Sequence, residues 1–138
     1  MHIRLIAIVL AATSAACAVT GANPSPLDVA PANLDAYWVA KPGQTNPGGN
    51  EPMYSCATAT IVISASGRVT DAVLDRIVPD TLTSRKVAVA YFLSRAYDPS
   101  PSNNGRRPVR VHASVISVLT NEDGSPLDLE LVRGQCSI

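Results

Sequence analysis

The sequence predicts an α+β fold in which a small antiparallel sheet has one helix packed on one face, in the order β-β-α-β with a possible fourth strand. Two alternating runs rich in β-branched residues, separated by a glycine turn, occupy residues 56–78, and a third alternating run occupies residues 109–119. Between them, residues 81–96 carry apolar side chains at helical spacing. With 138 residues, 46% of them apolar, the chain is long enough for one such domain.

Residues 1–18 have the organisation of a secretory signal segment. Arg4 precedes an apolar run over residues 5–12, and small residues follow it. This run is shorter than the ~20 apolar residues that a membrane-spanning helix needs. Ser14-Ala15-Ala16-Cys17 resembles a bacterial lipobox, in which Cys17 is acylated and becomes the first mature residue, whereas cleavage after Ala18 would remove it. Both alternatives predict an exported protein in the periplasm, and lipidation of Cys17 would anchor it to the outer membrane.

Residues 19–51 have the composition of a Pro/Gly-rich linker. The prolines and glycines in this segment disfavour long regular elements and predict an extended chain. An apolar island at residues 34–39 interrupts it and contains Trp38, the only tryptophan. Trp38 is either part of a hydrophobic brace that covers the core or part of a recognition patch. We favour the brace, because aromatic side chains in such segments usually pack against the domain.

The folded domain is expected over residues 52–138 and begins with a β-hairpin. Residues 57–64 alternate and are dense in β-branched side chains, which predicts a first strand. Residues 65–68 are typical of a turn in which Gly67 adopts a positive φ, and residues 69–78 form the second strand. Pro79 ends the hairpin.

A helix and a third strand follow the hairpin. Asp80 is expected to cap a helix over residues 81–96. The side of this helix expected to face the core carries Leu82, Val89, Phe92, Leu93 and Ala96. After a proline-rich loop, residues 109–119 form a long strand. Its polar positions are Arg110, His112 and Ser114.

A fourth strand is predicted over residues 127–132, where leucines alternate with acidic residues after a turn. Cys56 and Cys136 form an even pair in an exported chain, which predicts a disulfide. This bridge would close a loop of about 80 residues and contribute ~4 kcal/mol in the chain-entropy description. A fourth strand paired with the third would carry Cys136 away from Cys56 if the first strand is antiparallel to the third. The fourth strand, the disulfide and that pairing therefore conflict.

Several short motifs between the predicted elements, taken in chain order, resemble those of the C-terminal domain of the TonB energy transducers. They are Tyr54 after a proline, Gly67-Arg68-Val69 between two strands, Tyr97-Asp98-Pro99 after the helix, and Gly105-Arg106-Arg107-Pro108-Val109 before the third strand. The match covers residues 52–119. The short apolar run and the brief linker depart from a transducer, so we expect no energy transduction by this chain.

The resemblance also implies a mode of partner binding. In the family, the last strand pairs with an extended segment of an outer-membrane receptor, which adds to the sheet. Carried over, this places Arg110, His112 and Ser114 on the partner-binding strand. The simpler interpretation is that these side chains form the solvated face of a half-buried strand.

Other function classes receive less support from the sequence. Lys+Arg and Asp+Glu both number 11, so no basic balance indicates a nucleic-acid partner. His112 is the only histidine after the signal segment, and Asp71 and Asp75 on one strand face are explained by exposure to water. We expect no metal or other cofactor. The sequence thus predicts an exported envelope protein that acts as a protein–protein interaction module; the alternative is a periplasmic accessory enzyme or inhibitor-like protein on the same scaffold.

Overall fold

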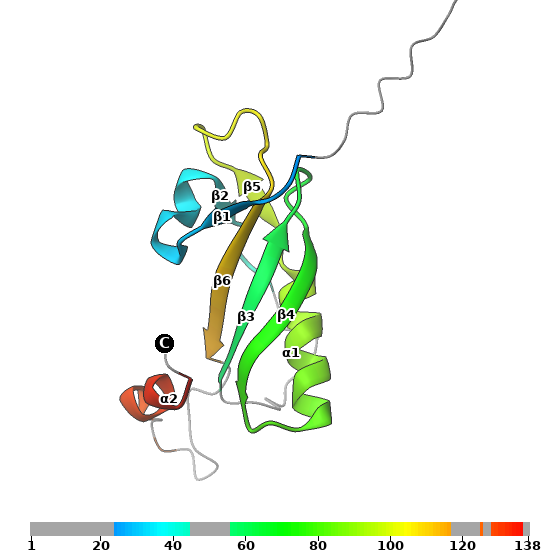
Figure 1. The fold of residues 1–138 in the computed structure, drawn as a ribbon. Coiled ribbons are helices and arrows are strands. Elements are labelled where there is room, and N and C mark those ends of the chain that lie inside the picture. The colour runs from blue at the N-terminus through cyan, green and yellow to red at the C-terminus, as the bar shows by residue number, and fades with distance from the viewer. Residues whose placement is uncertain (1–23, 45–55, 117–124, 126–127, 137–138) are drawn as a thin grey trace, which may run out of the picture.

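The computed structural model describes residues 24–44, 56–116, 125 and 128–136. These residues form a mixed α+β fold, which confirms the predicted class (Figure 1). In chain order the elements are β1 (Leu27–Val29), the 3₁₀ helix η1 (Pro31–Ala36), β2 (Trp38–Ala40), β3 (Cys56–Ile63), β4 (Val69–Val78), α1 (Leu82–Ser94), β5 (Tyr97–Pro99), β6 (Val109–Ile116) and α2 (Leu129–Cys136).

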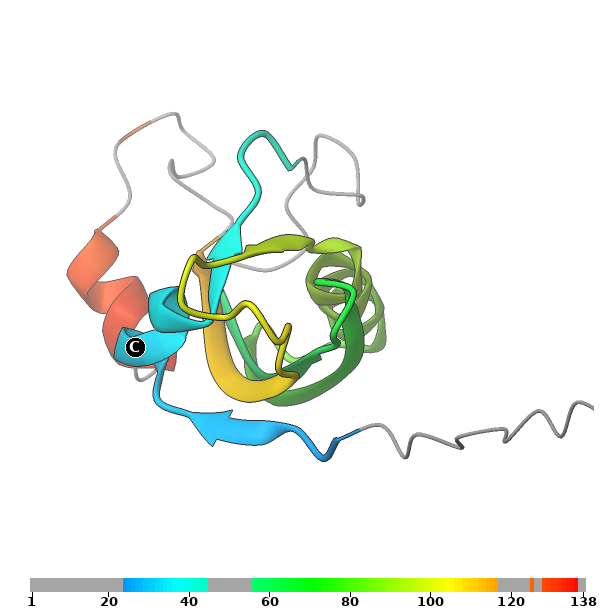
Figure 2. The ribbon, with the colours of Figure 1, turned by 90° about the horizontal axis from the view of Figure 1, so that it is seen from above.

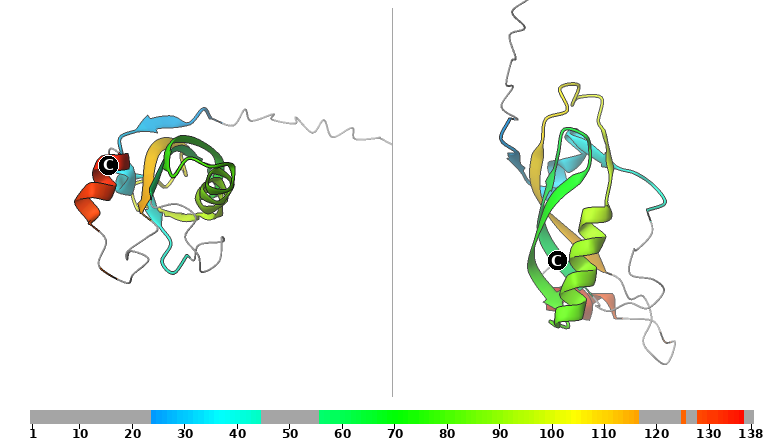
Figure 3. Two further views of the ribbon diagram at one scale, coloured as in Figure 1. Left: turned by 90° about the horizontal axis from the view of Figure 1, so that it is seen from below. Right: turned by 90° about the vertical axis from the view of Figure 1, so that its right-hand side faces the viewer.

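The main sheet has the strand order β1-β6-β3-β4. β3 is antiparallel to both β4 and β6, as predicted, with Cys56 opposite Val78 on one side and opposite Ile116 on the other. β1 was not predicted, and it pairs in parallel with β6, so the sheet is mixed. The strands curve around α1, which lies on their inner side (Figure 2; Figure 3, right).

The alternation of β3 determines which side of the sheet is buried. Its odd-numbered residues, from Ala57 to Ile63, belong to the core together with Val109 and Val111 of β6. The register of β4 against β3 shifts twice, so that Asp75 and Thr70 are extra residues in β4. These two bulges alter which residues of β4 face inwards, which a strict alternation could not predict.

The turn of the hairpin contains Gly67 in the predicted left-handed conformation, with a φ of 77°. Its N–H donates to the carbonyl of Ser64, and its carbonyl accepts from the N–H of Tyr97. A Cβ at this position would lie 2.2 Å from the Tyr97 carbonyl oxygen. Glycine is therefore required here both by the backbone conformation and by the approach of β5.

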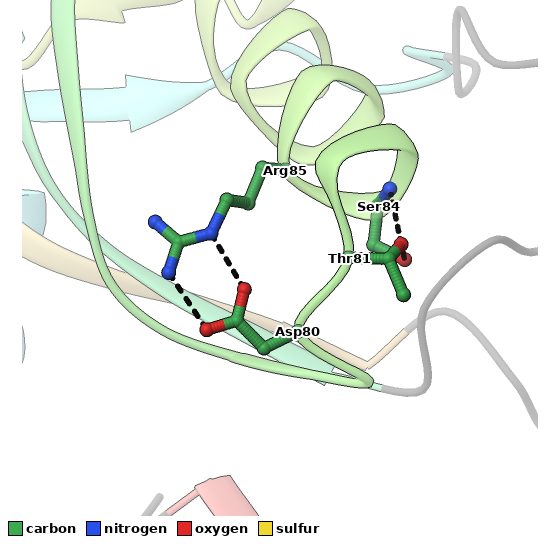
Figure 4. Close-up of polar contacts among 4 residues, drawn as sticks. All are labelled: Asp80, Thr81, Ser84 and Arg85. Carbon is green, nitrogen blue, oxygen red and sulfur yellow. Dashed lines mark hydrogen bonds and ion pairs between the residues drawn. The ribbon is translucent and has the colours of Figure 1, made fainter.

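Helix α1 begins one residue later than expected, because Thr81 caps it. The Thr81 hydroxyl accepts from the backbone N–H of Ser84 at 3.0 Å, as Figure 4 shows. Asp80, the predicted cap, instead binds the guanidinium of Arg85 through both carboxylate oxygens, at 2.5 and 2.7 Å. Both side chains can satisfy N-terminal groups, so the sequence pattern alone did not distinguish them.

The face of α1 that packs on the sheet also differs from the prediction. Ser84, Ala88 and Phe92 are buried, whereas Leu82 is 71% exposed and Leu93 is 42% exposed. Apolar residues lie on several sides of this helix, so their spacing did not specify one face. The small side chains of Ser84 and Ala88 line the buried side of the helix beside the sheet.

Residues 24–44, expected to belong to a linker, form β1, η1 and β2 and pack onto the domain. β2 pairs with β5 in a second, two-stranded sheet. Trp38 is fully buried in the core, which confirms the brace. A proline-rich composition excluded long elements here, but it did not exclude short strands that pair with residues distant in sequence.

The C-terminal segment corrects the predicted fourth strand. Residues from Leu129 to Cys136 form helix α2, with the carboxylate of Asp128 accepting from the N–H of Glu130 at 3.0 Å. Three alternating leucines form too short a pattern to specify a strand. The predicted disulfide between Cys56 and Cys136 is present, with a Cα–Cα distance of 6.2 Å. Of the three conflicting inferences, the fourth strand is therefore the wrong one.

Candidate functional site

The side of the sheet that faces away from α1 is mainly polar, except where Cys56, Val78 and Ile116 pack against Cys136 of α2, and we call its polar part the outer face. Successive side chains of a strand point to opposite sides of the sheet. In β3 and β6, the residues that lie between the core-facing ones therefore point to this side. Arg110, His112 and Ser114, the predicted partner-binding residues, lie on it. The outer face is defined by Asp28 of β1, Thr58, Thr60 and Val62 of β3, Asp71, Val73, Asp75 and Arg76 of β4, and Arg110, His112 and Ser114 of β6.

At its centre, three side chains from three strands meet in the Thr60–Asp75–His112 cluster. His112 Nδ1 lies 3.2 Å from Thr60 Oγ1 and 3.2 Å from Asp75 Oδ2. The Thr60 hydroxyl donates to the same carboxylate at 3.2 and 3.3 Å. Asp75 is the extra residue of a bulge, and this bulge gives its side chain a position beside Thr60 and His112. The cluster therefore links β4, β3 and β6 on the exposed side of the sheet.

A second contact connects β1 with β6. Arg110 Nη1 lies 3.2 Å from Asp28 Oδ1, in an ion pair between register partners. Beside it is a hollow of about 320 Å³ lined by Asp28, Val29, Ala30, Thr60, Arg110, Val111 and His112. Two of the three predicted site residues, Arg110 and His112, thus border one depression where β1 leaves the sheet.

The third predicted residue, Ser114, lies further along β6, opposite Thr58. Asp71 lies opposite Val62. Asp71 is not part of the cluster, so the two carboxylates of β4 have different surroundings. Asp28 and Thr60 were missed as site residues. Asp28 falls in the expected linker, and no pattern in that segment indicated a strand paired with β6.

The cluster can recognise a ligand, and its geometry differs from that of a catalytic relay. In a nucleophile–histidine–carboxylate relay, the hydroxyl and the carboxylate meet opposite nitrogens of the imidazole. Here both meet Nδ1, which leaves Nε2 of His112 available to a ligand. The His112 side chain is 70% exposed. Within the described ranges, no three His, Cys, Asp or Glu side chains gather where they could hold a metal ion.

The sheet has two stretches of edge without a strand partner among the described residues. β1 pairs only with Val109, Val111 and the residue between them, so the rest of β6 has no described strand on that side. The predicted fourth strand, which would have filled this edge, is helix α2 instead. β4 forms the opposite edge of the sheet. A hollow of about 300 Å³ lies beside the second half of β4 and extends to Asp80 and Arg85.

The ion pair between Asp80 and Arg85 borders this β4 hollow. The hydrogen bonds from the Arg85 guanidinium lower the pKa of the Asp80 carboxyl below its ordinary value. The same contacts raise the pKa of Arg85. Both side chains are more than half exposed to solvent, so this pair shapes the rim of the hollow and has only a small influence on stability.

Comparisons of this chain with family models, with curated proteins and with solved structures found no match. None of the described helices is long and apolar enough to cross a bilayer.

Proposed function

We propose that this chain is an exported envelope protein that binds an extended segment of another envelope protein as an added strand beside β6. The observation that carries the proposal is that β1 covers only the first three residues of β6. Beyond them, none of the described strands pairs with β6 on the β1 side, and η1, the next element after β1, contacts β6 without strand pairing. A segment placed there would continue the line of β1 and gain main-chain hydrogen bonds.

The backbone direction of β6 supports this position. The N–H of Leu27 donates to the carbonyl of Pro108, so the Pro108 carbonyl faces β1. The N–H and C=O groups of successive residues in a strand point to opposite neighbours. His112 and Ser114 lie an even number of residues after Pro108, so their N–H and C=O groups also face the β1 side. The side chains of both residues lie on the outer face, where they would contact alternate side chains of an added segment. Ala113 and Val115 are half-buried against the core on the other side.

The opposite edge, β4, suits strand addition less well. Its two bulges, at Thr70 and Asp75, interrupt the regular spacing of backbone groups. Asp71 and Asp75 also place carboxylates along it. Bulges and charged side chains are the features by which proteins prevent edge pairing. An added strand is therefore favoured at β6.

Export and anchoring belong to the same proposal. The Cys56–Cys136 disulfide supports an oxidising compartment such as the periplasm. The lipobox-like residues around Cys17 support acylation and an outer-membrane anchor, although Cys17 lies outside the described residues. The order β3-β4-α1-β6 supports the resemblance to the TonB C-terminal domain. We propose that the chain shares this mode of binding without transducing energy.

The proposal is tested by photo-crosslinking in intact envelopes. A photoreactive amino acid at position 112 should give a covalent adduct with a second envelope protein. The variant Ser114→Pro removes an N–H that faces the β1 side and leaves the pairing with β3 unchanged, so it should abolish the adduct. Ser114→Ala, which keeps the N–H, should retain it.

The controls separate strand addition from other contacts. The same photoreactive group at Thr83, exposed on α1, should give no adduct with that protein. An adduct that persists in Ser114→Pro, in protein whose disulfide is intact, would rule out main-chain pairing at β6. Adducts obtained from Val73 of β4 in place of position 112 would assign binding to the opposite edge.

A further inference from the structure

Three exposed arginines lie at one end of the molecule, which we call the arginine end: Arg68, Arg106 and Arg107. Arg68 belongs to the hairpin turn between β3 and β4, and the other two belong to the loop before β6. Both segments lie at the end of the sheet opposite α2 (Figure 1; Figure 3, right). Residues far apart in the sequence thus gather positive charge at one end.

The ion pairs among the described residues leave this charge unpaired. Asp98 is paired with Lys41 at 3.1 Å, and Asp28 is paired with Arg110 at 3.2 Å. In the part of the chain that the structure describes, no ion pair joins Arg68, Arg106 or Arg107 to a carboxylate. The arginine end therefore carries three positive charges that are available to an external anion.

The loop that carries Arg106 and Arg107 is held firmly. The N–H of Arg107 donates to Asn103 Oδ1 at 2.8 Å, and its carbonyl accepts from Trp38 Nε1 at 2.9 Å. Asn103 is buried and donates in turn to the carbonyl of Tyr37 at 3.0 Å. Arg106 has a φ of 47°, a conformation that is unfavourable for a residue with a side chain. An exposed arginine is thus held in a position where glycine would be less strained.

The described chain also begins at this end. Pro24 lines a hollow of about 590 Å³ together with Ser66 of the hairpin turn and Pro108 of the loop. Only six residues separate Pro24 from Cys17. A fully extended chain of this length spans at most ~25 Å. An acyl group on Cys17 would therefore keep the arginine end close to the bilayer.

We propose that the arginine end rests on the anionic headgroups of the membrane that holds acylated Cys17. This inference depends on the lipidation proposed above. Each cation close to an anionic leaflet adds a favourable interaction, which acts only within about a Debye length of the surface. The short tether supplies that proximity. The contact directs α2 and the β6 edge away from the membrane, where a partner can reach them.

Energy transfer from the protein to a lipid dye tests this orientation. The acylated full protein, purified from its envelope, is labelled at Gly105→Cys or Gly134→Cys and placed in vesicles that contain a headgroup dye. A Cβ at either glycine would meet no other atom within 4 Å, so neither substitution disturbs packing. In vesicles of phosphatidylcholine with phosphatidylglycerol, we expect clearly greater transfer from position 105 than from position 134.

The charge dependence completes the test. Arg106→Gln combined with Arg107→Gln, or high salt, should lower transfer from position 105 about twofold or more, whereas Arg133→Gln at the far end should leave it unchanged. Equal transfer from both ends, or no effect of the double substitution, would overturn the inference. An intact mass without an acyl group at Cys17 would also overturn it. No protein partner is present in these vesicles, so strand addition is judged separately by crosslinking.

Discussion

The indole Nε1–H of Trp38 donates to the backbone carbonyl of Arg107 at 2.9 Å, joining residues that are 69 positions apart. Trp38 is fully buried, and its strand β2 pairs with β5. The contact attaches the N-terminal segment to the loop before β6. It makes residues 24–44 part of the folded domain, and it fixes the loop that carries two of the exposed arginines.

Replacing Trp38 should therefore destabilise the whole domain. We expect Trp38→Ala to lower the free energy of unfolding by ~3–5 kcal/mol, because it leaves a cavity in the core and an unpaired carbonyl at Arg107. Urea denaturation measures this loss. The neighbouring Val39 is 47% exposed, and Val39→Ala should change stability by ~0.5 kcal/mol or less. A similar small change for both variants would show that the brace contributes little.

Gly67 and Gly43 allow backbone strain to be separated from steric overlap. Both have a positive φ, of 77° and 71°, but only Gly67 lies against other atoms. Gly43→Ala should cost ~1–2 kcal/mol, which is the strain of a left-handed alanine. Gly67→Ala adds a collision with the Tyr97 carbonyl and should cost at least ~1 kcal/mol more. Thermal unfolding measures the loss of stability in each variant. The two losses would be equal only if β5 could move away from the turn.

The disulfide should stabilise the domain and hold α2 in place. Cys56 and Cys136 are both buried, and Val78 and Ile116 pack around them. Reduction, or the double variant Cys56→Ala with Cys136→Ala, should lower the free energy of unfolding by up to ~4 kcal/mol. Denaturation with and without reductant measures the difference. The double variant itself should show no response to reductant, which provides the control.

Asp80 should give a stability difference that depends on pH. Its pKa is lowered in the folded protein by the hydrogen bonds from Arg85. The resulting stabilisation is present above the ordinary carboxyl pKa of ~4 and is lost as the pH falls through the lowered value. The Tm of the wild type should thus slightly exceed that of Asp80→Asn at neutral pH, and the gap should close in acid. A gap that widened in acid would contradict this assignment.

The elements with strong local patterns were predictable from the sequence. The run of β-branched residues in β3, the conformation of Gly67 and the helix after Pro79 all reflect properties of neighbouring residues. The disulfide followed from the count of cysteines in an exported chain. In the strand, the turn and the helix, one dominant local signal acted without competition, whereas the disulfide prediction conflicted with the predicted fourth strand.

The remaining features depend on contacts between distant residues. β1 is only three residues long and forms because β6 offers it an edge. The bulge at Asp75, which gives that side chain its place beside His112, depends on the register of β4 against β3. The helical state of residues 129–136 accompanies the bridge from Cys136 to Cys56. None of these relationships leaves a periodic signal in the segment itself, so sequence patterns could not reveal the complete outer face.

The position of the disulfide divides the chain into two parts that respond differently to proteolysis. A single cut anywhere between Cys56 and Cys136 leaves both fragments covalently joined, so α2 remains attached to β3. A cut between Gln44 and Cys56 separates the segment containing β1 and Trp38, which is then retained only by non-covalent packing. Loss of that fragment would uncover the full length of β6 and detach the domain from any anchor at Cys17.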